Sequence, residues 1–294
     1  MRRDTDDEHN KTIDENERIK EHYNKINNKS VQERNFTRNI NIRNVHNFMK
    51  SCLFLTYIKQ DDRVLDLGIG KGGDFRKYQV VKISELYGID VANKSILDAY
   101  WRAWAICVNY KTILKTKDCY TRKIALNRKF DIVSIQFSFH YCFAKEEYVD
   151  TTIDNIARHL LPGGYVLITM PCKNEILRRR NLNRLSNKFY KIDFQGQASD
   201  QIYGNSYHYT LVDSVNDCVE YLVDMEALIG KMGQYGIRLV IDQPFEDFFK
   251  SCKSNFRGLY IKNNLKDLTD DEWEVMCLHH VVVFKSYQSQ PSNQ

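Results

Sequence analysis

Hydrophobic and polar positions separate the chain into a charged leading segment and a longer region with the periodicity of buried elements. In residues 1–44 charged residues outnumber apolar ones, and neither Gly nor Pro occurs. This composition predicts a solvated tail that is partly helical or disordered. From Val45 to Leu55 apolar residues recur at helical spacing, which predicts an amphipathic helix that opens a domain over residues 45–294.

Beyond residue 60, short apolar runs alternate with helical patterns. The expected strands are residues 63–67, 85–90, 112–117, 130–136 and 165–170, and the expected helices are residues 75–81, 93–109 and 146–161. Alternating strands and helices require crossover connections, which favour a parallel sheet covered by helices and hence an α/β fold. Two more strand candidates follow, residues 238–242 and 279–284, and we expect the last one to pair at the edge of the sheet.

A long stretch separates the fifth expected strand from the sixth. About 65 residues lie between Met170 and Arg238, far more than such connections usually contain. We therefore predict a functional, substrate-binding insertion over residues 172–236. Residues 173–191 are rich in Lys and Arg, whereas residues 192–230 contain acids and neither Lys nor Arg. Two interpretations stay open: two solvated faces that pack together, or a substrate lid with a phosphate-facing and a base-facing side.

Composition narrows the class of protein. Of the 294 residues, 43% are hydrophobic, which is enough for a sizeable core, but no apolar run approaches the ~20 residues of a membrane-spanning helix. The start of the chain lacks the apolar stretch of a secretory signal, so we expect an intracellular protein with no membrane segment. Eight irregularly spaced cysteines fit reduced thiols rather than disulfides or a metal site. The 43 basic and 38 acidic residues permit a polyanionic partner without requiring one.

A glycine-rich loop follows the first expected strand, where an open α/β sheet binds its ligands. Gly68, Gly70 and Gly73 allow the tight turn and the close ligand approach that a Cβ would prevent. Their spacing also satisfies the dinucleotide fingerprint. Asp66 disfavours an NAD oxidoreductase, because a dinucleotide site normally carries an apolar residue there, whereas a carboxylate could serve an amino-acid-like group.

Two further acids end the next strands. Asp90 is placed to bond ribose hydroxyls, and Asp118 is placed for an adenine amino group. Any one of these acids would more often be a cap or turn residue. Together with Phe130-Asp131 and the Leu161-Pro-Gly-Gly164 turn, they resemble the class I S-adenosylmethionine-dependent methyltransferase pattern over about residues 60–170. This resemblance implies a Rossmann-like, mostly parallel seven-stranded sheet flanked by helices, with S-adenosyl-L-methionine as cofactor and S-adenosyl-L-homocysteine as its product.

The segment after the fourth strand, Gln136-Phe137-Ser138-Phe139-His140-Tyr141, faces the methyl group in such folds and therefore reports on the acceptor. It is not the Asn/Asp-Pro-Pro-Tyr motif of amino-group methyltransferases, which argues against an exocyclic adenine nitrogen. Combined with Asn44-Val-His-Asn-Phe-Met-Lys50, the glycine loop with its Lys71, and Asp217-Cys-Val-Glu220, it closely resembles the eukaryotic mRNA cap (guanine-N7) methyltransferases. The resemblance runs from about residue 42 to residue 284.

That resemblance implies roles position by position. The cofactor-binding positions are Lys50, Asp66, Gly68, Asp90, Asp118, Gln136, Ser138 and Tyr141, with Lys50 reaching the methionine carboxylate. The positions that contact the cap phosphates are Lys71, Lys77 and Arg102. The remaining cap-side positions are His140 and Glu220, which hold the guanine, the pocket walls Phe137, Pro171 and Tyr207, and the flanking His46, Asn47 and His279.

The chemistry of the cap supports these roles, although the chain departs from the family pattern at three positions. Guanine presents N1–H and N2–H donors side by side, which a carboxylate such as Glu220 can accept, and a triphosphate bridge calls for Lys and Arg. His46 stands where the family usually has Asn, and His279 stands where it usually has Tyr. Both positions line the cap side, so guanine stacking and ribose contacts are less secure. Ile69 replaces a usual Cys, a change we expect to be neutral.

The activity that the resemblance implies is methyl transfer from S-adenosyl-L-methionine to N7 of the cap guanine by in-line attack. Guanine N7 carries its own lone pair, so we expect no general base, and catalysis by orientation and electrostatic complementarity. The alternatives are another class I methyltransferase acting on tRNA or a small molecule, and an inactive cap- or RNA-binding module. The expected partner is the 5′ end of capped mRNA. We further expect a nuclear monomer, with the capping guanylyltransferase or the transcription machinery as candidate protein partners.

Overall fold

The computed structural model describes residues 20, 21, 24, 33, 36–196 and 201–287. The tail predicted over residues 1–44 therefore lies mostly outside the described residues. Helix α3 (Ile40–Tyr57) begins before the expected boundary at residue 45, and Ile42 in its first turn is already buried. No helix in the described part of the chain is both long enough and apolar enough to cross a membrane.

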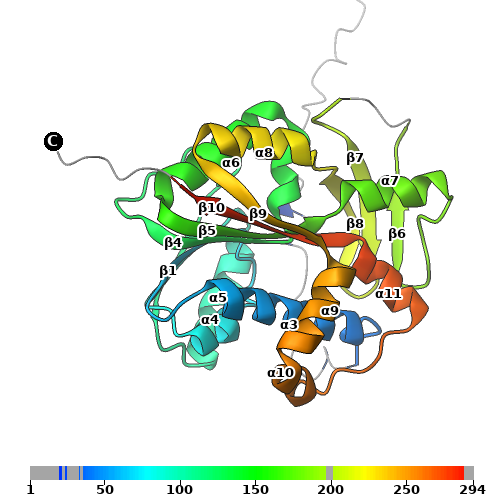
Figure 1. The fold of residues 1–294 in the computed structure, drawn as a ribbon, viewed down its shortest axis with the longest axis horizontal. Helices are drawn as coiled ribbons and strands as arrows, with labels where there is room; N and C mark the ends of the chain where they lie inside the picture. The colour runs from blue at the N-terminus through cyan, green and yellow to red at the C-terminus, as the bar shows by residue number, and fades with distance from the viewer. Residues whose placement is uncertain (1–19, 22–23, 25–32, 34–35, 197–200, 288–294) are drawn as a thin grey trace, which may run out of the picture.

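A seven-stranded sheet forms the centre of the molecule (Figure 1). The order of its strands is β3 (Lys111–Thr116), β2 (Glu85–Asp90), β1 (Arg63–Leu67), β4 (Phe130–Gln136), β5 (Leu160–Pro171), β10 (His279–Ser286) and β9 (Ile237–Pro244). The pairs from β3 to β5 are parallel, and β10 is antiparallel to both of its neighbours. The mostly parallel seven-stranded sheet implied by the sequence is thus confirmed.

The position expected for the last strand is wrong. Strand β10 does not pair at the edge of the sheet but lies between β5 and β9, and β9 forms the edge. The residues from His279 to Phe284 are all buried. A continuous apolar run such as Val281 to Phe284 is typical of a strand that is covered on both faces, which an edge position would not provide.

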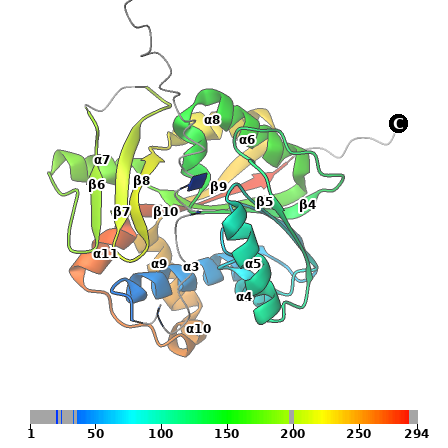
Figure 2. The same ribbon diagram turned by 180° about the vertical axis from the view of Figure 1, so that it is seen from behind.

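Helices cover the two faces of this sheet separately (Figures 1 and 2). One face is covered by α3, α4 (Phe75–Val81), α5 (Asn93–Ala105) and α9 (Phe245–Asn255), whose buried side chains belong to one core cluster. The opposite face is covered by α6 (Glu146–His159), α8 (Met225–Gln234) and the 3-10 helix η1 (Phe139–Ala144). Two short helices, α10 (Arg257–Lys262) and α11 (Asp270–Cys277), connect α9 to β10. The core is therefore continuous above and below the strands.

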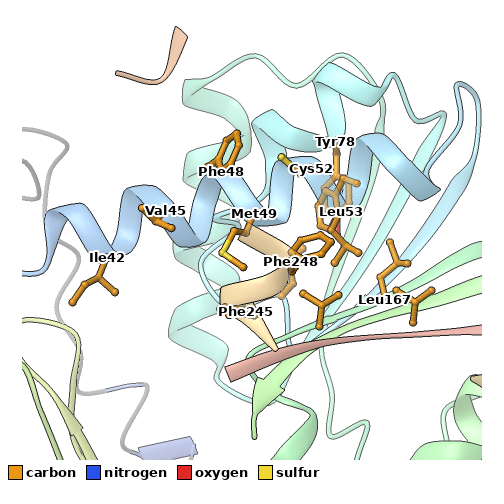
Figure 3. Packing of buried hydrophobic residues seen from close by; sticks show 14 of the residues in the cluster. Ile42, Val45, Phe48, Met49, Cys52, Leu53, Tyr78, Leu167, Phe245 and Phe248 are labelled. Carbon is orange, nitrogen blue, oxygen red and sulfur yellow. The ribbon is translucent and has the colours of Figure 1, made fainter. Parts of the chain in front are cut away.

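Helix α3 is anchored along its whole length by its apolar face. Figure 3 shows Met49 of this helix pointing toward Phe245 and Phe248 of α9, and the ring centroid of Phe48 lies 6.1 Å from that of Phe249, also in α9. Its last turns stack on α4, since the rings of Phe54 and Tyr78 lie parallel with centroids 4.9 Å apart. This packing fixes the orientation of the polar face of α3, which carries His46, Asn47 and Lys50.

The predicted insertion contributes a second, smaller sheet. Its antiparallel strands are β6 (Tyr190–Asp193), β7 (Ser206–Leu211) and β8 (Val215–Tyr221), and α7 (Lys173–Asn181) precedes them. The last part of the predicted insertion belongs instead to the main fold. Helix α8 buries Leu228 and Met232 in the same cluster as Ile153 of α6. The segregated charges meet in part: Lys173 pairs with Asp224 at 2.7 Å, whereas Arg179 pairs with Glu274 of α11.

Two glycine substitutions test this packing with opposite signs. Gly164→Ala should lower the free energy of unfolding by about 1–3 kcal/mol, because an added Cβ would lie 2.6 Å from the carbonyl oxygen of Asp131. Gly230→Ala should raise it by about 0.5–1 kcal/mol, because Gly230 lies at an exposed position of helix α8 with no atom within 4 Å of an added Cβ. Urea unfolding followed by circular dichroism measures both changes. Effects of the same sign would contradict the close approach at the start of β5.

Candidate functional site

A cavity of about 400 Å³ opens at the carboxyl ends of the main strands and faces the small sheet. In open α/β sheets ligands bind at this end of the strands. All eight predicted cofactor residues line it: Lys50, Asp66, Gly68, Asp90, Asp118, Gln136, Ser138 and Tyr141. Six of the predicted substrate residues line it as well: His46, Phe137, His140, Pro171, Glu220 and His279. The structure thus brings together residues that are up to 233 positions apart, His46 and His279 being the extremes.

The glycine loop between β1 and α4 forms one wall of this cavity. Gly68 has a φ of +78°, and an added Cβ would lie 2.4 Å from Oγ of Ser138. Gly70 has a φ of +55°, and an added Cβ would meet no atom within 4 Å. The first glycine is therefore required by close packing, whereas at the second the loop borders open space that a ligand can enter.

Asp66 lies almost fully buried near the end of β1. The hydroxyl of Tyr78 donates a hydrogen bond to its Oδ2 at 2.8 Å. Burial, together with the nearby carboxylate of Asp74, raises the pKa of Asp66 to about 8. The ionised form of such a buried acid is stabilised by a ligand that brings a positive charge, such as an ammonium group.

Asp74, the residue before α4, is held between two ammonium groups. The Nζ of Lys50 and the Nζ of Lys77 each lie 2.7 Å from its Oδ1. Burial alone would raise the pKa of Asp74, but the two lysines outweigh it and hold that pKa well below its usual value. Lys77 also donates to Oδ1 of Asn47 at 2.8 Å. Lys50 therefore pairs with Asp74 in this structure, and its predicted contact with a methionine carboxylate would require it to serve both groups.

The two other strand-end acids form bonds to their own loops and still border the cavity. Asp90 accepts from the backbone N–H of Gly70 and from that of Ala92, both at 2.8 Å, while burial raises its pKa. Asp118 accepts from the N–H groups of Tyr120 and Thr121 at 3.0 and 2.9 Å. Each is a turn residue in the ordinary sense, yet a carboxylate oxygen has further lone pairs that can accept from a ligand.

The segment that follows β4 is fixed by bonds to neighbouring strands. Gln136 donates through Nε2 to the carbonyl of Leu167 at 3.0 Å. Ser138 donates to the carbonyl of Leu67 at 3.2 Å and accepts from the hydroxyl of Tyr120 at 2.8 Å. The hydroxyl of Tyr141 lies 3.4 Å from Sγ of Cys218 in β8. The last contact ties this segment to the small sheet, so both sides of the cavity are held in register.

Glu220 provides a buried carboxylate at the small-sheet side of the cavity. Strand β7 pairs with β8 so that Tyr207 stands opposite Glu220, and the Tyr207 hydroxyl donates to Oε2 at 2.7 Å. Burial raises the pKa of Glu220 to about 7, an effect that this hydrogen bond opposes. His140 Nε2 lies 3.7 Å from Oε1, which is too far for a hydrogen bond. The Oε1 side therefore has no hydrogen-bond donor from His140.

The same end of the cavity contains three neutral histidine side chains and a phenylalanine with an unusual backbone conformation. The rings of His46 and His279 lie 5.5 Å apart between centroids, and His46 lies 5.1 Å from Phe137. Burial lowers the pKa of His140 to about 3, that of His279 to about 4, and that of His46 well below its usual value. Phe137 has a φ of +57°, a left-handed conformation that costs a non-glycine residue energy and is held by its surroundings. All three histidines are therefore uncharged at pH 7.

Five predicted substrate residues do not line the cavity: Asn47, Lys71, Lys77, Arg102 and Tyr207. Lys71 pairs with Asp98 of α5 at 3.0 Å. Arg102 flanks the loop, since an added Cβ on Gly73 would lie 3.9 Å from its Nη1. Tyr207 lies behind Glu220 as its hydrogen-bond donor, not as a pocket wall. The basic residues thus surround the rim of the glycine loop.

Comparison with known families identifies the chain. A family model described as the mRNA (guanine-N(7))-methyltransferase domain matches residues 6–287. The chain belongs to this family. The mRNA cap guanine-N(7) methyltransferase of Saccharomyces cerevisiae is 34% identical in an alignment 268 positions long, which covers 82% of this chain and 61% of the yeast protein. The one from Drosophila melanogaster is 28% identical in a gapped alignment 333 positions long, which covers 91% of this chain and 76% of the fly protein.

Solved structures agree on the fold of this mRNA (guanine-N(7))-methyltransferase domain. An S-adenosylmethionine-dependent methyltransferase from Clostridium acetobutylicum has a TM-score of 0.54 at 12% identity, covering 84% of this chain and 92% of that one. The N-methyltransferase NodS from Bradyrhizobium japonicum, solved in complex with S-adenosyl-L-homocysteine, has a TM-score of 0.54 at 13% identity, covering 94% and 100%. The fold is therefore that of the class I methyltransferases. The chain spans about three fifths of the length of the yeast relative.

The cavity fits the cofactor that this fold family implies. Its volume of about 400 Å³ is in the range of small-ligand sites. Asp66 is a buried acid that favours a cation, Asp90 can accept from hydroxyl donors, and Gly70 leaves open space beside them. These groups match the ammonium, the ribose and the bulk of S-adenosyl-L-methionine. Among the described residues no group of three or more His, Cys, Asp and Glu could hold a metal ion.

The sequence did not indicate several residues of the site. Asp74, Tyr120, Tyr209, Leu211 and Val215 all line the cavity. Tyr207, Tyr209 and Leu211 lie two positions apart along β7 and therefore share one face of the strand. This period of two was the signal that could have found Tyr209 and Leu211. Asp74 had no local signal, because its importance depends on the two lysines that α3 and α4 bring to it.

Removal of the Asp74 carboxylate should destabilise the fold strongly. Asp74→Asn should lower the free energy of unfolding by about 3–5 kcal/mol at pH 7, because two poorly solvated ammonium groups lose their shared partner. The carboxyl pKa of Asp74 is lower in the folded chain than in the unfolded chain, so the ionised group stabilises the fold at pH values above its unfolded pKa. The stability difference from wild type should therefore persist down to about pH 4 and shrink below it. Urea unfolding at several pH values measures this.

The matched control for this variant is Asp150→Asn, which removes a carboxylate from an exposed pair with Lys231. It should cost less than about 1 kcal/mol. If the two variants lost equal stability, Asp74 would not act as a buried ion-pair centre.

Proposed function

We propose that the chain methylates N7 of the guanine in the 5′ cap of mRNA, with S-adenosyl-L-methionine as the methyl donor. The observation that carries the proposal is the buried Glu220 carboxylate of the small sheet, which lines the same cavity as Asp66 and Asp90. The matching family model and the relatives named as cap guanine-N(7) methyltransferases support the same activity.

The proposed cofactor end is the strand-end half of the cavity. S-adenosyl-L-methionine would supply an electrophilic methyl group there. Asp66 would accept from its ammonium group, Asp90 would accept from its ribose hydroxyls, and Asp118 would accept from its adenine amino group. Gly68, Gln136, Ser138 and Tyr141 form the surrounding walls, and Lys50 stands at the carboxylate end beside Asp74.

The proposed guanine end is the small-sheet half of the cavity. Glu220 would accept from guanine N1–H and N2–H, a paired contact that only an ionised carboxylate makes well. Tyr207 already bonds Oε2, so it fixes the direction in which Glu220 can accept. The rings of Phe137, His46 and His279, with Pro171, offer apolar and aromatic surfaces to a purine. This part of the site selects for guanine over adenine, because adenine presents no donor at N1.

No residue of the chain needs to remove a proton for this reaction. Guanine N7 carries a free lone pair and no proton, so the three neutral histidines of the cavity, which lie against aromatic rings, have no proton to remove from it. The contribution of the chain is to hold guanine in one orientation and to exclude water. Neutral histidines also avoid adding positive charge beside a guanine that becomes cationic as it is methylated.

The proposed cap-phosphate contacts are Lys71, Lys77 and Arg102, which surround the glycine loop rather than the cavity floor. We also propose that the protein acts as a monomer in the nucleus on the 5′ end of capped mRNA. We further propose that a capping guanylyltransferase supplies the unmethylated cap.

Methyl transfer to defined acceptors tests the function directly. The enzyme is given labelled S-adenosyl-L-methionine with unmethylated capped RNA, and the labelled nucleoside is identified after digestion. We expect 7-methylguanosine that depends on the cap, because the capped RNA offers guanine donors, a triphosphate bridge and the nucleotide that follows it together. Parallel reactions with uncapped RNA, tRNA and GTP serve as controls. Label in tRNA alone would favour another class I acceptor, and cofactor binding without any transfer would favour an inactive binding module.

The protonation state of Glu220 should set an acid limb in the pH profile. With S-adenosyl-L-methionine saturating, kcat/KM for capped RNA should rise as the pH increases through about 7, because Glu220 must lose its proton to accept from guanine. Glu220→Gln should lower kcat/KM by about 100-fold or more at pH 8 and remove this limb, since its amide accepts only one donor.

The matched control is Glu226→Gln, which changes an exposed acid at the start of α8. It should retain both the rate and the acid limb. Full cap methylation by Glu220→Gln would rule out the proposed role in guanine recognition.

A further inference from the structure

A second hollow of about 450 Å³ lies beside the main cavity, between α3, α4 and the segment that contains α10. Figures 1 and 2 both show α10 next to α3 on the side of the sheet that carries α4 and α9. None of the predicted cofactor residues lines this hollow. Two of the predicted cap residues, Asn47 and Lys77, line it instead of the main cavity.

The lining of this hollow combines positive charge, amides and apolar surface. Its cations are Arg76, Lys77 and Lys262, and its amides are Asn44, Asn47 and Asn263. No carboxylate occurs among its lining residues in the described part of the chain. Val80, Leu259 and Leu265 supply the apolar surface. Such a mixture suits a ligand with negative charge, hydrogen-bonding edges and flat apolar faces, which is the chemistry of a nucleotide.

One thin partition separates the second hollow from the main cavity. On α3, His46 lines the main cavity and the next residue, Asn47, lines the hollow. Before and within α4, Asp74 lines the main cavity and Lys77 lines the hollow. Lys77 Nζ contacts both Asp74 and Asn47, at 2.7 and 2.8 Å, so the partition is this bonded trio. A chain that leaves the cap-binding end therefore reaches the hollow across a few side chains.

The surface beyond the hollow continues the positive charge. Residues 248–266 contain five basic residues and no acidic one. Lys253 and Arg257 border a further groove with Tyr260 on the other side of α10. The ammonium group of Lys253 lies 4.8 Å from the centre of the Tyr260 ring. A basic track with an aromatic ring beside it is the arrangement by which proteins follow single-stranded nucleic acid.

We propose that this hollow binds the first RNA nucleotides that follow the cap, with Arg76 and Lys262 contacting their phosphates. The proposal rests on the cap-methylating function proposed above, and it names the part of the substrate that the main cavity does not hold. An acidic protein segment would match the charge. It would not account for the three amides or for the shared partition with the cap-binding end.

The test compares substrates of different length on one pair of variants. Arg76→Ala/Lys262→Ala should leave kcat and KM for the cap dinucleotide GpppA unchanged, because both side chains lie outside the main cavity. For a capped RNA of about ten nucleotides, KM should rise about 5- to 20-fold, since two phosphate contacts are lost. The slope of log(kcat/KM) against log salt should fall by about 1.4, the value for two contacts on a single strand.

The control variant Lys115→Ala/Lys129→Ala removes the same charge from two exposed positions that do not line the hollow, one on the edge strand β3 and one directly before β4. It should leave both substrates unaffected, and thermal melting confirms that both variants are folded. Equal KM for the capped RNA in the two variants would overturn the proposal, and an acidic partner would then be the better candidate. Absence of methylation of GpppA and of capped RNA by the wild type would instead overturn the proposed function itself.

Discussion

The carboxylate of Asp74 binds Lys50 and Lys77 where α3, the glycine loop and α4 meet. Neither ammonium group is well solvated, so the three charges are stable only as a set. The set fixes α3 relative to the loop that carries Gly68 and Gly70. The main cavity and the second hollow share this set as a wall, and the small sheet closes the main cavity from the other side. The arrangement of ligand-facing groups therefore depends on one ion-pair network.

The main cavity carries a buried acid at each end. Asp66 and Glu220 are both more costly to ionise than an exposed acid, because burial removes water from the charge. A ligand that brings a cation to the first and two N–H donors to the second lowers both costs. Ionisation and binding are thus linked, and a ligand that lacks either feature leaves a carboxylate unpaired. The cavity therefore selects against a ligand that leaves one of these two carboxylates without a partner.

Much of the main sheet and the cofactor end could be predicted from the sequence, because both are encoded locally. The bounds predicted for β1, β2 and β4 match those of the structure, since each is a compact apolar run with turn residues at its ends. The roles of individual site residues stay predictions. The strands of the small sheet, the contact of Asp74 with two lysines, and the placement of Tyr207 behind Glu220 depend on how distant segments meet. A local pattern shows that residues 279–284 form a strand, but it does not show that β5 and β9 are its neighbours.

The central place of β10 also constrains how the chain can fold as it is synthesised. Strands β5 and β9 are bridged by β10, which follows every other strand of the main sheet in sequence. The residues between Pro244 and His279 must be made first, which takes a few seconds at ~5–20 residues per second. During that interval the nascent chain exposes the edges of both strands. The half of the sheet that contains β9 can assemble only once β10 has left the ribosome.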